Sequence, residues 1–217
     1  MIKWIIFDID GTLIETALSN MRGLQQTMRD LYKREYIDEE LHRLMGIPGD
    51  EALRKIGIKE EELMDTWRYW RLKVKDYAHH NYVFEGVEEM LRDLSKEYSL
   101  AIVTSKTYEQ LHEDFTKRGL LDYFKLWICK EDTVRHKPNP EPLLKALDKA
   151  GITAGDAIYL GDAVVDYEAA KAAGIEFGHC RFMKMIDHID CELIFNNPKE
   201  IAEFFLNRDS GERIKAI

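Results

Sequence analysis

Two aspartates stand two positions apart in FDIDGTLIET, residues 7 to 16. Residues two apart in an extended strand face the same side, so Asp8 and Asp10 can approach one point. Close carboxylates repel each other unless a cation lies between them, and Mg²⁺ suits such a site because it prefers oxygen ligands. Gly11 follows at once, and a glycine lets the backbone turn tightly and come close to a bound ligand. The stretch therefore predicts a site for Mg²⁺ and a ligand at the end of an apolar run.

Three other stretches add residues that suit a phosphate group. Thr104 and Ser105 end the apolar run SLAIVTSK and offer hydroxyls and backbone amides to phosphate oxygens. Lys137 lies in RHKPNPEP, where three prolines stiffen the backbone just after the lysine and hold its ammonium in place. Asp162 ends the run AIYLGD, and Asp166 follows it by one helical turn. Each feature is weak alone, but together they form a set of groups suited to phosphoryl transfer.

The chemistry that these groups favour proceeds in two steps. A carboxylate attacks phosphorus to give an aspartyl phosphate, which divides one difficult displacement into two easier ones. A neighbouring acid protonates the leaving oxygen and then takes a proton from the attacking water. We assign the first role to Asp8 and the second to Asp10. Mg²⁺, Lys137 and Thr104 would stabilise charge on the equatorial phosphoryl oxygens.

The apolar runs that precede these residues predict the fold. They are rich in Ile, Val and Leu and are nearly continuous rather than alternating, as in parallel strands covered on both faces. Helical patterns such as GVEEMLRDLSKEY and PEPLLKALDKAG separate them. We therefore expect an α/β fold with a Rossmann-like parallel sheet and helices on both of its faces. The runs are IKWIIFDID near the start, and those within residues 99–106, 125–132, 157–162 and 192–197.

One part of the chain departs from this alternation. Residues 15–80 contain no convincing strand and are typical of consecutive helices, so we expect an inserted all-helical cap domain. The α/β core then consists of residues 1–14 and 81–217. An apolar stripe along one long helix of the insertion is predicted to pack inside the lobe. The stripe consists of Leu63, Trp67, Trp70, Val74 and Tyr77.

In this order the motifs resemble those of the haloacid dehalogenase superfamily of phosphohydrolases. DIDGT is similar to the first motif of the superfamily, VTS to the second, the lysine of HKPNP to the third and GDAVVD to the fourth. The helical insertion directly after the first motif is similar to the cap of the phosphoglycolate phosphatase-like branch. In that comparison MGIPGDEAL, residues 45 to 53, is the cap loop that reaches the active site.

The resemblance implies a role for each motif residue. Asp8 would be the nucleophile and Asp10 the general acid and base, while Thr104 and Lys137 would bind phosphate. Asp162 would be a metal ligand, and Asp166 either a further ligand or its support. The expected cofactor is Mg²⁺, held by Asp8, Asp10 and Asp162, and the phosphate-binding set also includes Ser105 and Gly11.

The resemblance leaves several activities to compare. Dehalogenases of the superfamily lack the second acid, so the presence of Asp10 argues against halide release. A phosphomutase of the β-phosphoglucomutase type keeps both acids and remains an alternative. A phospho-accepting signalling module also combines acids, Mg²⁺, Thr and Lys, but it needs no proton shuttle. The leading prediction is a phosphatase acting on phosphoglycolate, a sugar phosphate, a nucleotide or pyrophosphate.

The composition of the chain limits its expected binding partners and its expected location in the cell. The chain of 217 residues has a formal net charge of -9, which argues against a nucleic-acid surface. No apolar run approaches the length of a membrane span, and the N-terminus lacks a signal-peptide pattern. Three cysteines without paired spacing suggest reduced thiols, so we expect a cytoplasmic protein, either a monomer or a homodimer.

A histidine- and cysteine-containing segment, residues 177–191, invites a metal-site interpretation. His179 and Cys180 are adjacent, and adjacent side chains tend to diverge. His188 and Cys191 follow, but no Cys-x-x-Cys pair is present. We therefore expect these four residues to be structural.

Overall fold

The computed structural model describes residues 2–183 and 188–207. Two compact units separate by their internal packing. The first unit comprises residues 1–13 and 84–217, and the second comprises residues 14–83.

The first unit is built on a six-stranded sheet with the order β5-β4-β1-β6-β7-β8. Every neighbouring pair in this sheet is parallel. The predicted α/β fold with a parallel core sheet is therefore confirmed. The strands are β1 (Trp4–Phe7), β4 (Ser99–Val103), β5 (Phe124–Ile128), β6 (Ala157–Gly161), β7 (Glu176–Cys180) and β8 (Leu193–Phe195).

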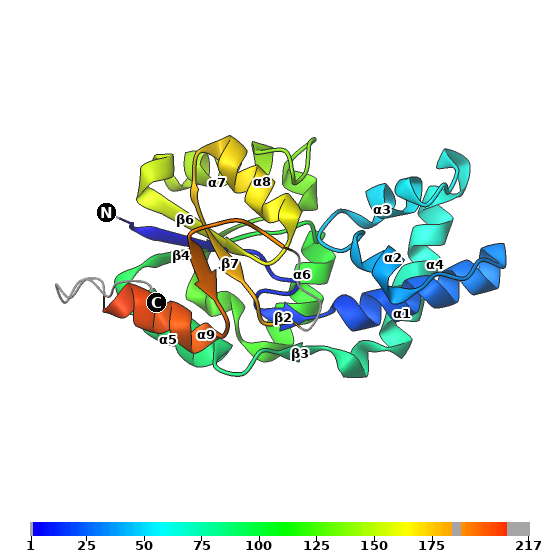
Figure 1. The fold of residues 1–217 in the computed structure, drawn as a ribbon, viewed down its shortest axis with the longest axis horizontal. Helices are drawn as coiled ribbons and strands as arrows, with labels where there is room; N and C mark the ends of the chain where they lie inside the picture. The colour runs from blue at the N-terminus through cyan, green and yellow to red at the C-terminus, as the bar shows by residue number, and fades with distance from the viewer. Residues whose placement is uncertain (1, 184–187, 208–217) are drawn as a thin grey trace. The chain divides into compact units, whose positions relative to one another are not determined.

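Helices cover both faces of this sheet. Helices α7 and α8 lie on one face and α5 and α9 on the other (Figure 1). The central strands are buried on both sides, which explains why their sequences are continuous apolar runs. The α-helices are α5 (Val87–Glu97), α6 (Tyr108–Phe115), α7 (Glu141–Ala150), α8 (Val164–Ala173) and α9 (Pro198–Leu206), and the short 3₁₀ turns are η4 (Thr116–Arg118), η5 (Leu121–Tyr123), η6 (Lys130–Asp132) and η7 (Ala154–Asp156).

The second unit is mainly helical. Helices α1 and α4 pack along each other, and Trp70 donates a hydrogen bond from Nε1 to the Asn20 carbonyl at 3.0 Å. Leu63, Trp70 and Val74 of the apolar stripe are buried, whereas Trp67 and Tyr77 are partly exposed. The elements are β2 (Ile14–Glu15), α1 (Ala17–Thr27), the π-helical turn η1 (Met28–Tyr32), α2 (Asp38–His42), α3 (Gly49–Lys55), η2 (Glu60–Glu62), α4 (Leu63–Asp76), η3 (Ala78–His80) and β3 (Tyr82–Val83).

The two chain segments at the ends of the second unit form a short antiparallel ribbon. In this ribbon Ile14 pairs with Val83 and Glu15 with Tyr82. Packing assigns the ribbon to the second unit, so the division falls at 13/14 and 83/84. The sequence patterns divide the chain at 14/15 and 80/81, because two-residue strands carry no periodicity that a sequence pattern could detect.

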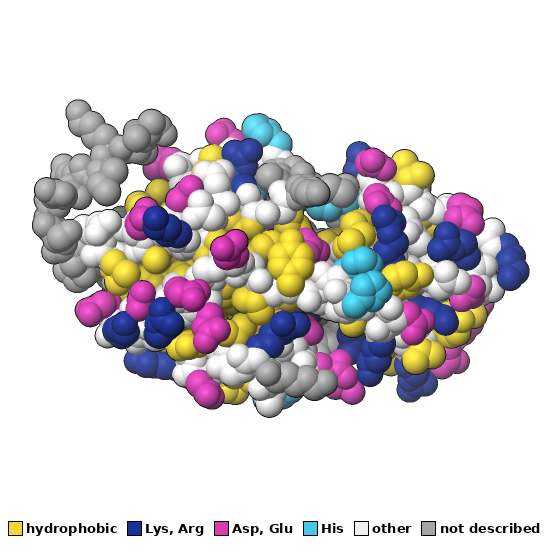
Figure 2. Space-filling model, turned by 90° about the horizontal axis from the view of Figure 1, so that it is seen from below, with side chains coloured by type: hydrophobic (Ala, Val, Ile, Leu, Met, Phe, Trp, Pro, Cys, Tyr) yellow, Lys and Arg dark blue, Asp and Glu magenta, His cyan; other side chains and the backbone are white. Residues whose placement is uncertain are grey.

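The helices and one face of the surface bear on binding to membranes and nucleic acids. Among the described residues, no helix is long and apolar enough to cross a membrane. Figure 2 shows Lys and Arg side chains interspersed with Asp and Glu over the described part of one face. Such mixing on that face, with the net charge of -9, does not resemble the concentrated basic surface that nucleic-acid binding needs.

A buried aromatic contact should be important for the stability of the first unit. Phe115 on α6 is fully buried and packs edge-on against Phe124 of β5, with ring centroids 6.2 Å apart. We expect Phe115→Ala to lower the free energy of unfolding by about 3–5 kcal/mol, because it removes a ring and leaves a cavity. Urea denaturation measures this loss.

Lys3→Ala is the matched surface control. It removes the exposed pair between Lys3 and Asp156, whose atoms lie 2.8 Å apart, and should cost less than about 1 kcal/mol. Equal losses for the two variants would contradict the assigned core.

Candidate active site

The residues singled out in the sequence follow the carboxyl ends of neighbouring strands. Strand β1 lies between β4 and β6, and the three strands end next to Asp8, Thr104 and Asp162 respectively. In open parallel sheets, ligands bind beyond this edge. The sheet order therefore brings together three motif residues that are far apart in the sequence.

A buried lysine joins two of the acids. Nζ of Lys137 donates hydrogen bonds to Oδ1 of Asp8 at 2.9 Å and to Oδ1 of Asp166 at 2.6 Å. All three side chains are almost completely buried. Lys137 precedes a cis peptide bond to Pro138, in the loop that leads to α7. An ammonium buried in this way is tolerated because two carboxylates compensate its charge.

The electrostatics of this cluster are strongly perturbed. Burial raises the pKa of Asp8 to about 7, with Lys137 opposing the rise and Asp166 adding to it. Burial also raises the pKa of Asp162 well above its ordinary value, and the charges of Asp166 and Asp8 act in the same direction. Burial by itself lowers the pKa of Lys137, but Asp166 and Asp8 outweigh it and the pKa is raised. One lysine thus faces three acids, and the site has an excess of carboxyl groups over cations.

This excess suits a divalent cation. Carboxylate oxygens of Asp8, Asp162 and Asp166 all lie within 4.8 Å of one another. Hard oxygen ligands in a small cluster are the donor set that Mg²⁺ uses. Both oxygens of Asp166 also have partners in the protein, since Oδ2 accepts a hydrogen bond from the Ala163 amide at 3.1 Å. The cluster therefore fits a cation, with Asp166 already engaged by its neighbours.

Two glycines allow the acids to lie this close to the backbone. Gly11 has a φ of +78°, and a Cβ at this position would lie 2.2 Å from Oδ2 of Asp162. A Cβ on Gly161 would lie 2.7 Å from the side chain of Asp166. Any larger residue at either position would displace an acid of the cluster.

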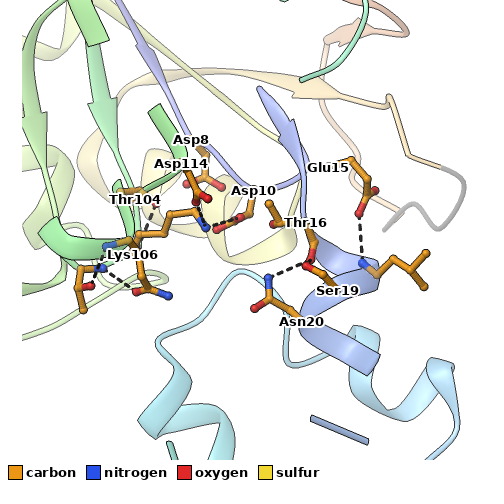
Figure 3. Close-up of polar contacts among 12 residues, drawn as sticks. Asp8, Asp10, Glu15, Thr16, Ser19, Asn20, Thr104, Lys106 and Asp114 are labelled. Atoms are coloured by element: carbon orange, nitrogen blue, oxygen red, sulfur yellow. Dashed lines mark hydrogen bonds and ion pairs between the residues drawn. The ribbon is translucent and has the colours of Figure 1, made fainter. Parts of the chain in front are cut away.

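Asp10 has a different partner from Asp8. Its Oδ1 lies 2.8 Å from Nζ of Lys106, which is also 2.9 Å from Oδ2 of Asp114 on α6 (Figure 3). Lys106 is buried; burial by itself lowers its pKa, but Asp10 and Asp114 outweigh this and the pKa is raised. The two aspartates of the first motif are therefore each paired with a separate buried lysine.

The second motif lies beside this pair. Thr104 is buried, and its hydroxyl oxygen accepts a hydrogen bond from the Lys106 amide at 3.2 Å. The Thr104 amide bonds to the Ile128 carbonyl at the end of β5. Ser105 lies between Thr104 and Lys106 in the same turn and is partly exposed. The turn is thus fixed to two strands of the sheet.

Sequence reasoning missed three residues of this region. Lys106 follows the second motif directly, and a lysine beside two candidate phosphate ligands was the available signal. Asp114 had no signal, because it is one acid on an ordinary amphipathic helix. Tyr159 also had none, since a tyrosine in the run AIYLGD is typical of a core residue. Its hydroxyl lies 3.0 Å from Nζ of Lys137 and donates to Oδ1 of Asp166 at 2.9 Å.

The histidine and cysteine segment does not form a metal site in the described part of the chain. There, the acid cluster is the sole group of three or more potential ligands that gathers. Nε2 of His179 lies 3.2 Å from the Asp162 carbonyl oxygen, and Cys180 is buried. His188 is exposed and Cys191 is partly buried. The predicted cap loop, residues 45–53, runs into α3 of the second unit, and its contact with substrate stays a prediction.

Comparison with known proteins agrees with this arrangement. The haloacid dehalogenase-like hydrolase family matches residues 5–179. A pyrophosphatase PpaX from Listeria welshimeri is 33% identical over 178 residues, which cover 79% of this chain and 80% of the relative. A phosphoglycolate phosphatase from Aquifex aeolicus is 31% identical over 178 residues, or 78% of this chain and 80% of the relative. The chain therefore belongs to the haloacid dehalogenase-like hydrolase family, and the resemblance of its motifs is confirmed.

Solved structures have the same fold. A protein from Lactobacillus plantarum superposes with a TM-score of 0.84 at 24% identity, covering 94% of this chain and 100% of its own. A haloacid dehalogenase-like hydrolase from Streptococcus pneumoniae gives a TM-score of 0.80 at 19% identity, covering 94% and 98%. The fold is thus common to proteins that differ widely in sequence.

The hydrogen bonds of Tyr159 lead to a stability prediction. Tyr159→Phe removes a hydroxyl that contacts two charged groups, and we expect the free energy of unfolding to fall by about 1.5–3 kcal/mol. Tyr98→Phe is the matched control, because that buried hydroxyl donates to the neutral Phe205 carbonyl at 3.0 Å. Its loss should be about 0.5–1.5 kcal/mol. Urea denaturation of both variants distinguishes them, and a loss for Tyr159→Phe no larger than the control would contradict the charged network.

Proposed function

We propose that this protein is a Mg²⁺-dependent phosphatase that hydrolyses a small phosphorylated metabolite through an aspartyl phosphate on Asp8. The observation that carries the proposal is the buried carboxylate of Asp8. It lies at the carboxyl edge of a parallel sheet, bonded to Lys137 and grouped with Asp162 and Asp166. Membership of a hydrolase family supports the same conclusion.

The first step transfers the phosphoryl group to the protein. A carboxylate oxygen of Asp8 forms a bond to phosphorus while the bond from phosphorus to the leaving oxygen breaks. Asp10 donates its proton to that oxygen, so the leaving group departs in its protonated form. Asp10 is partly exposed, as a group that exchanges protons with substrate and water must be.

The second step returns the protein to its starting state. A water molecule attacks phosphorus, and Asp10 accepts the proton that this water loses. The bond between phosphorus and Asp8 breaks, which releases inorganic phosphate and restores both carboxyl groups. No oxidant or further substrate is required.

The remaining motif residues bind the phosphoryl group and the cation. Lys137, Thr104 and Ser105 would bind phosphoryl oxygens, and Gly11 would let the backbone approach them. Asp8, Asp10 and Asp162 would hold Mg²⁺, with Asp166 supporting the site through Lys137 and Tyr159. When bound, Mg²⁺ would neutralise negative charge on the transferring group.

The names of two relatives support a class of substrate. The two relatives described above are named a pyrophosphatase and a phosphoglycolate phosphatase, and both names describe release of phosphate from a small compound. We propose a substrate of this size. Three free cysteines also support an activity in the reducing environment of the cytoplasm.

Phosphate release from a panel of compounds tests the proposal. The panel contains pyrophosphate, phosphoglycolate, sugar phosphates and nucleotides, each with Mg²⁺ or with a chelator. We expect Mg²⁺-dependent release by the wild type and a loss of about 10⁴-fold or more in Asp8→Asn, because the nucleophile is gone. Full activity in Asp8→Asn would contradict the mechanism, and an isomeric sugar phosphate without free phosphate would identify a mutase instead.

Thermal unfolding tests the metal site without relying on activity. A ligand that binds only the folded state at 100 times its dissociation constant stabilises it by about 2.7 kcal/mol. We expect Mg²⁺ to raise the melting temperature of the wild type and to raise that of Asp162→Asn much less, because one carboxylate ligand is lost. Each variant is compared with itself in chelator, so any effect of the substitution alone cancels. Equal shifts in the two proteins would place the cation elsewhere.

A further inference from the structure

We propose that Lys106 and Asp114 are positioning residues for Asp10, which they hold in the orientation needed to protonate the leaving group. The inference rests on the proposed function, in which Asp10 passes protons. It adds two residues that lie outside the four motifs and that act through Asp10 rather than by contact with the reacting atoms.

The geometry is a chain of three charged groups. Nζ of Lys106 is 2.8 Å from Oδ1 of Asp10 and 2.9 Å from Oδ2 of Asp114 (Figure 3). The lysine side chain is 8% exposed, whereas those of Asp10 and Asp114 are 29% and 23% exposed. The cation is thus enclosed between two acids that both reach solvent.

The backbone segments that carry Lys106 and Asp114 are both held in place by hydrogen bonds. The Lys106 amide bonds to Thr104 Oγ1, and its carbonyl accepts from the Lys130 amide at 2.8 Å, which ties the turn to the segment after β5. Asp114 lies on α6, whose first turn is capped by Thr107. Thr107 Oγ1 accepts from the Gln110 amide, while the Gln110 side chain accepts from the Thr107 amide. The ammonium is therefore held between two fixed backbone segments.

A buried ammonium in a fixed place directs its carboxylate partner. Charge-assisted hydrogen bonds are short and strong, so Oδ1 of Asp10 is held toward Lys106. Without Asp114, Lys106 would keep one acid instead of two and would lose its fixed position. The orientation of Asp10 relative to the leaving group would then be less well fixed, and a small misplacement of a catalytic group costs much of its effect.

The same arrangement occurs at the neighbouring aspartate. Asp8 is held by Lys137, which is held in turn by Asp166. Each aspartate of the first motif thus has its own buried lysine and its own second acid. This similarity between Asp114 and Asp166 supports a positioning role for Asp114, beyond neutralising the charge of Lys106.

The test compares two substrates of nearly the same shape. Phenyl phosphate has a poor leaving group that needs a proton, whereas p-nitrophenyl phosphate has a good one that needs little help. In Asp114→Asn we expect kcat/KM to fall about 10-fold or more for phenyl phosphate and less than about 3-fold for p-nitrophenyl phosphate. kcat/KM is the relevant constant because it reports the first transfer, in which the leaving group departs.

Two further variants make the result specific. Tyr108 lies on α6, as Asp114 does, and donates a hydrogen bond to Asp132 of η6 at 2.6 Å. Tyr108→Phe removes this bond and should leave the ratio of kcat/KM for the two substrates unchanged. Lys106→Arg keeps the charge but changes the geometry, and should reproduce the selective loss. It also serves as the second test if Asp114→Asn does not fold.

The outcomes separate the two claims. Equal losses for both substrates, or no loss in Asp114→Asn and Lys106→Arg, would overturn the positioning role and leave the proposed phosphatase intact. Hydrolysis that persists in Asp8→Asn would overturn the phosphatase mechanism itself, and with it the role assigned to Asp114.

Discussion

The buried ammonium of Lys137 is the interaction on which the site depends. It bonds to Asp8, 129 residues away in the sequence, and to Asp166, 29 residues away. Either acid buried alone would be a costly unpaired charge, so the lysine is what allows both to lie beneath the edge of the sheet. Because its partners follow β1 and begin α8, the same contact ties the first strand to the last motif. The stability of the site and the state of the nucleophile therefore depend on one side chain.

The order of the strands brings the other site residues together. With β1 between β4 and β6, residues that follow three separate apolar runs meet at one edge, and the glycines there let acids approach the backbone. Asp8 and Asp10 then diverge in their surroundings. The first is buried between Lys137 and the acid cluster, and the second is partly exposed beside Lys106. This difference in environment suits a nucleophile in one case and a proton carrier in the other.

Much of this arrangement could be predicted from the sequence, for identifiable reasons. Continuous apolar runs that end at Asp8, Thr104 and Asp162 predict parallel strands, and the meeting of their ends follows from the geometry of such sheets. The pairing of Lys137 with Asp8 could not be predicted, because contact between side chains 129 residues apart leaves no local pattern. Tyr159 could not be identified for another reason. Its ring packs in the core, as the apolar run predicts, and nothing in the sequence shows that its hydroxyl bonds to Asp166. The ribbon formed by β2 and β3 was missed because two residues are too few to show a period.

Capture of the covalent intermediate is the most direct test of the central claim, that Asp8 is the nucleophile. The protein is quenched in acid during turnover, digested, and its peptides are examined by mass spectrometry. The account predicts one added phosphoryl group on the peptide that contains Asp8, present in Asp10→Asn and absent in Asp8→Asn. A phosphoryl group on any other residue, or one that still forms in Asp8→Asn, would contradict it.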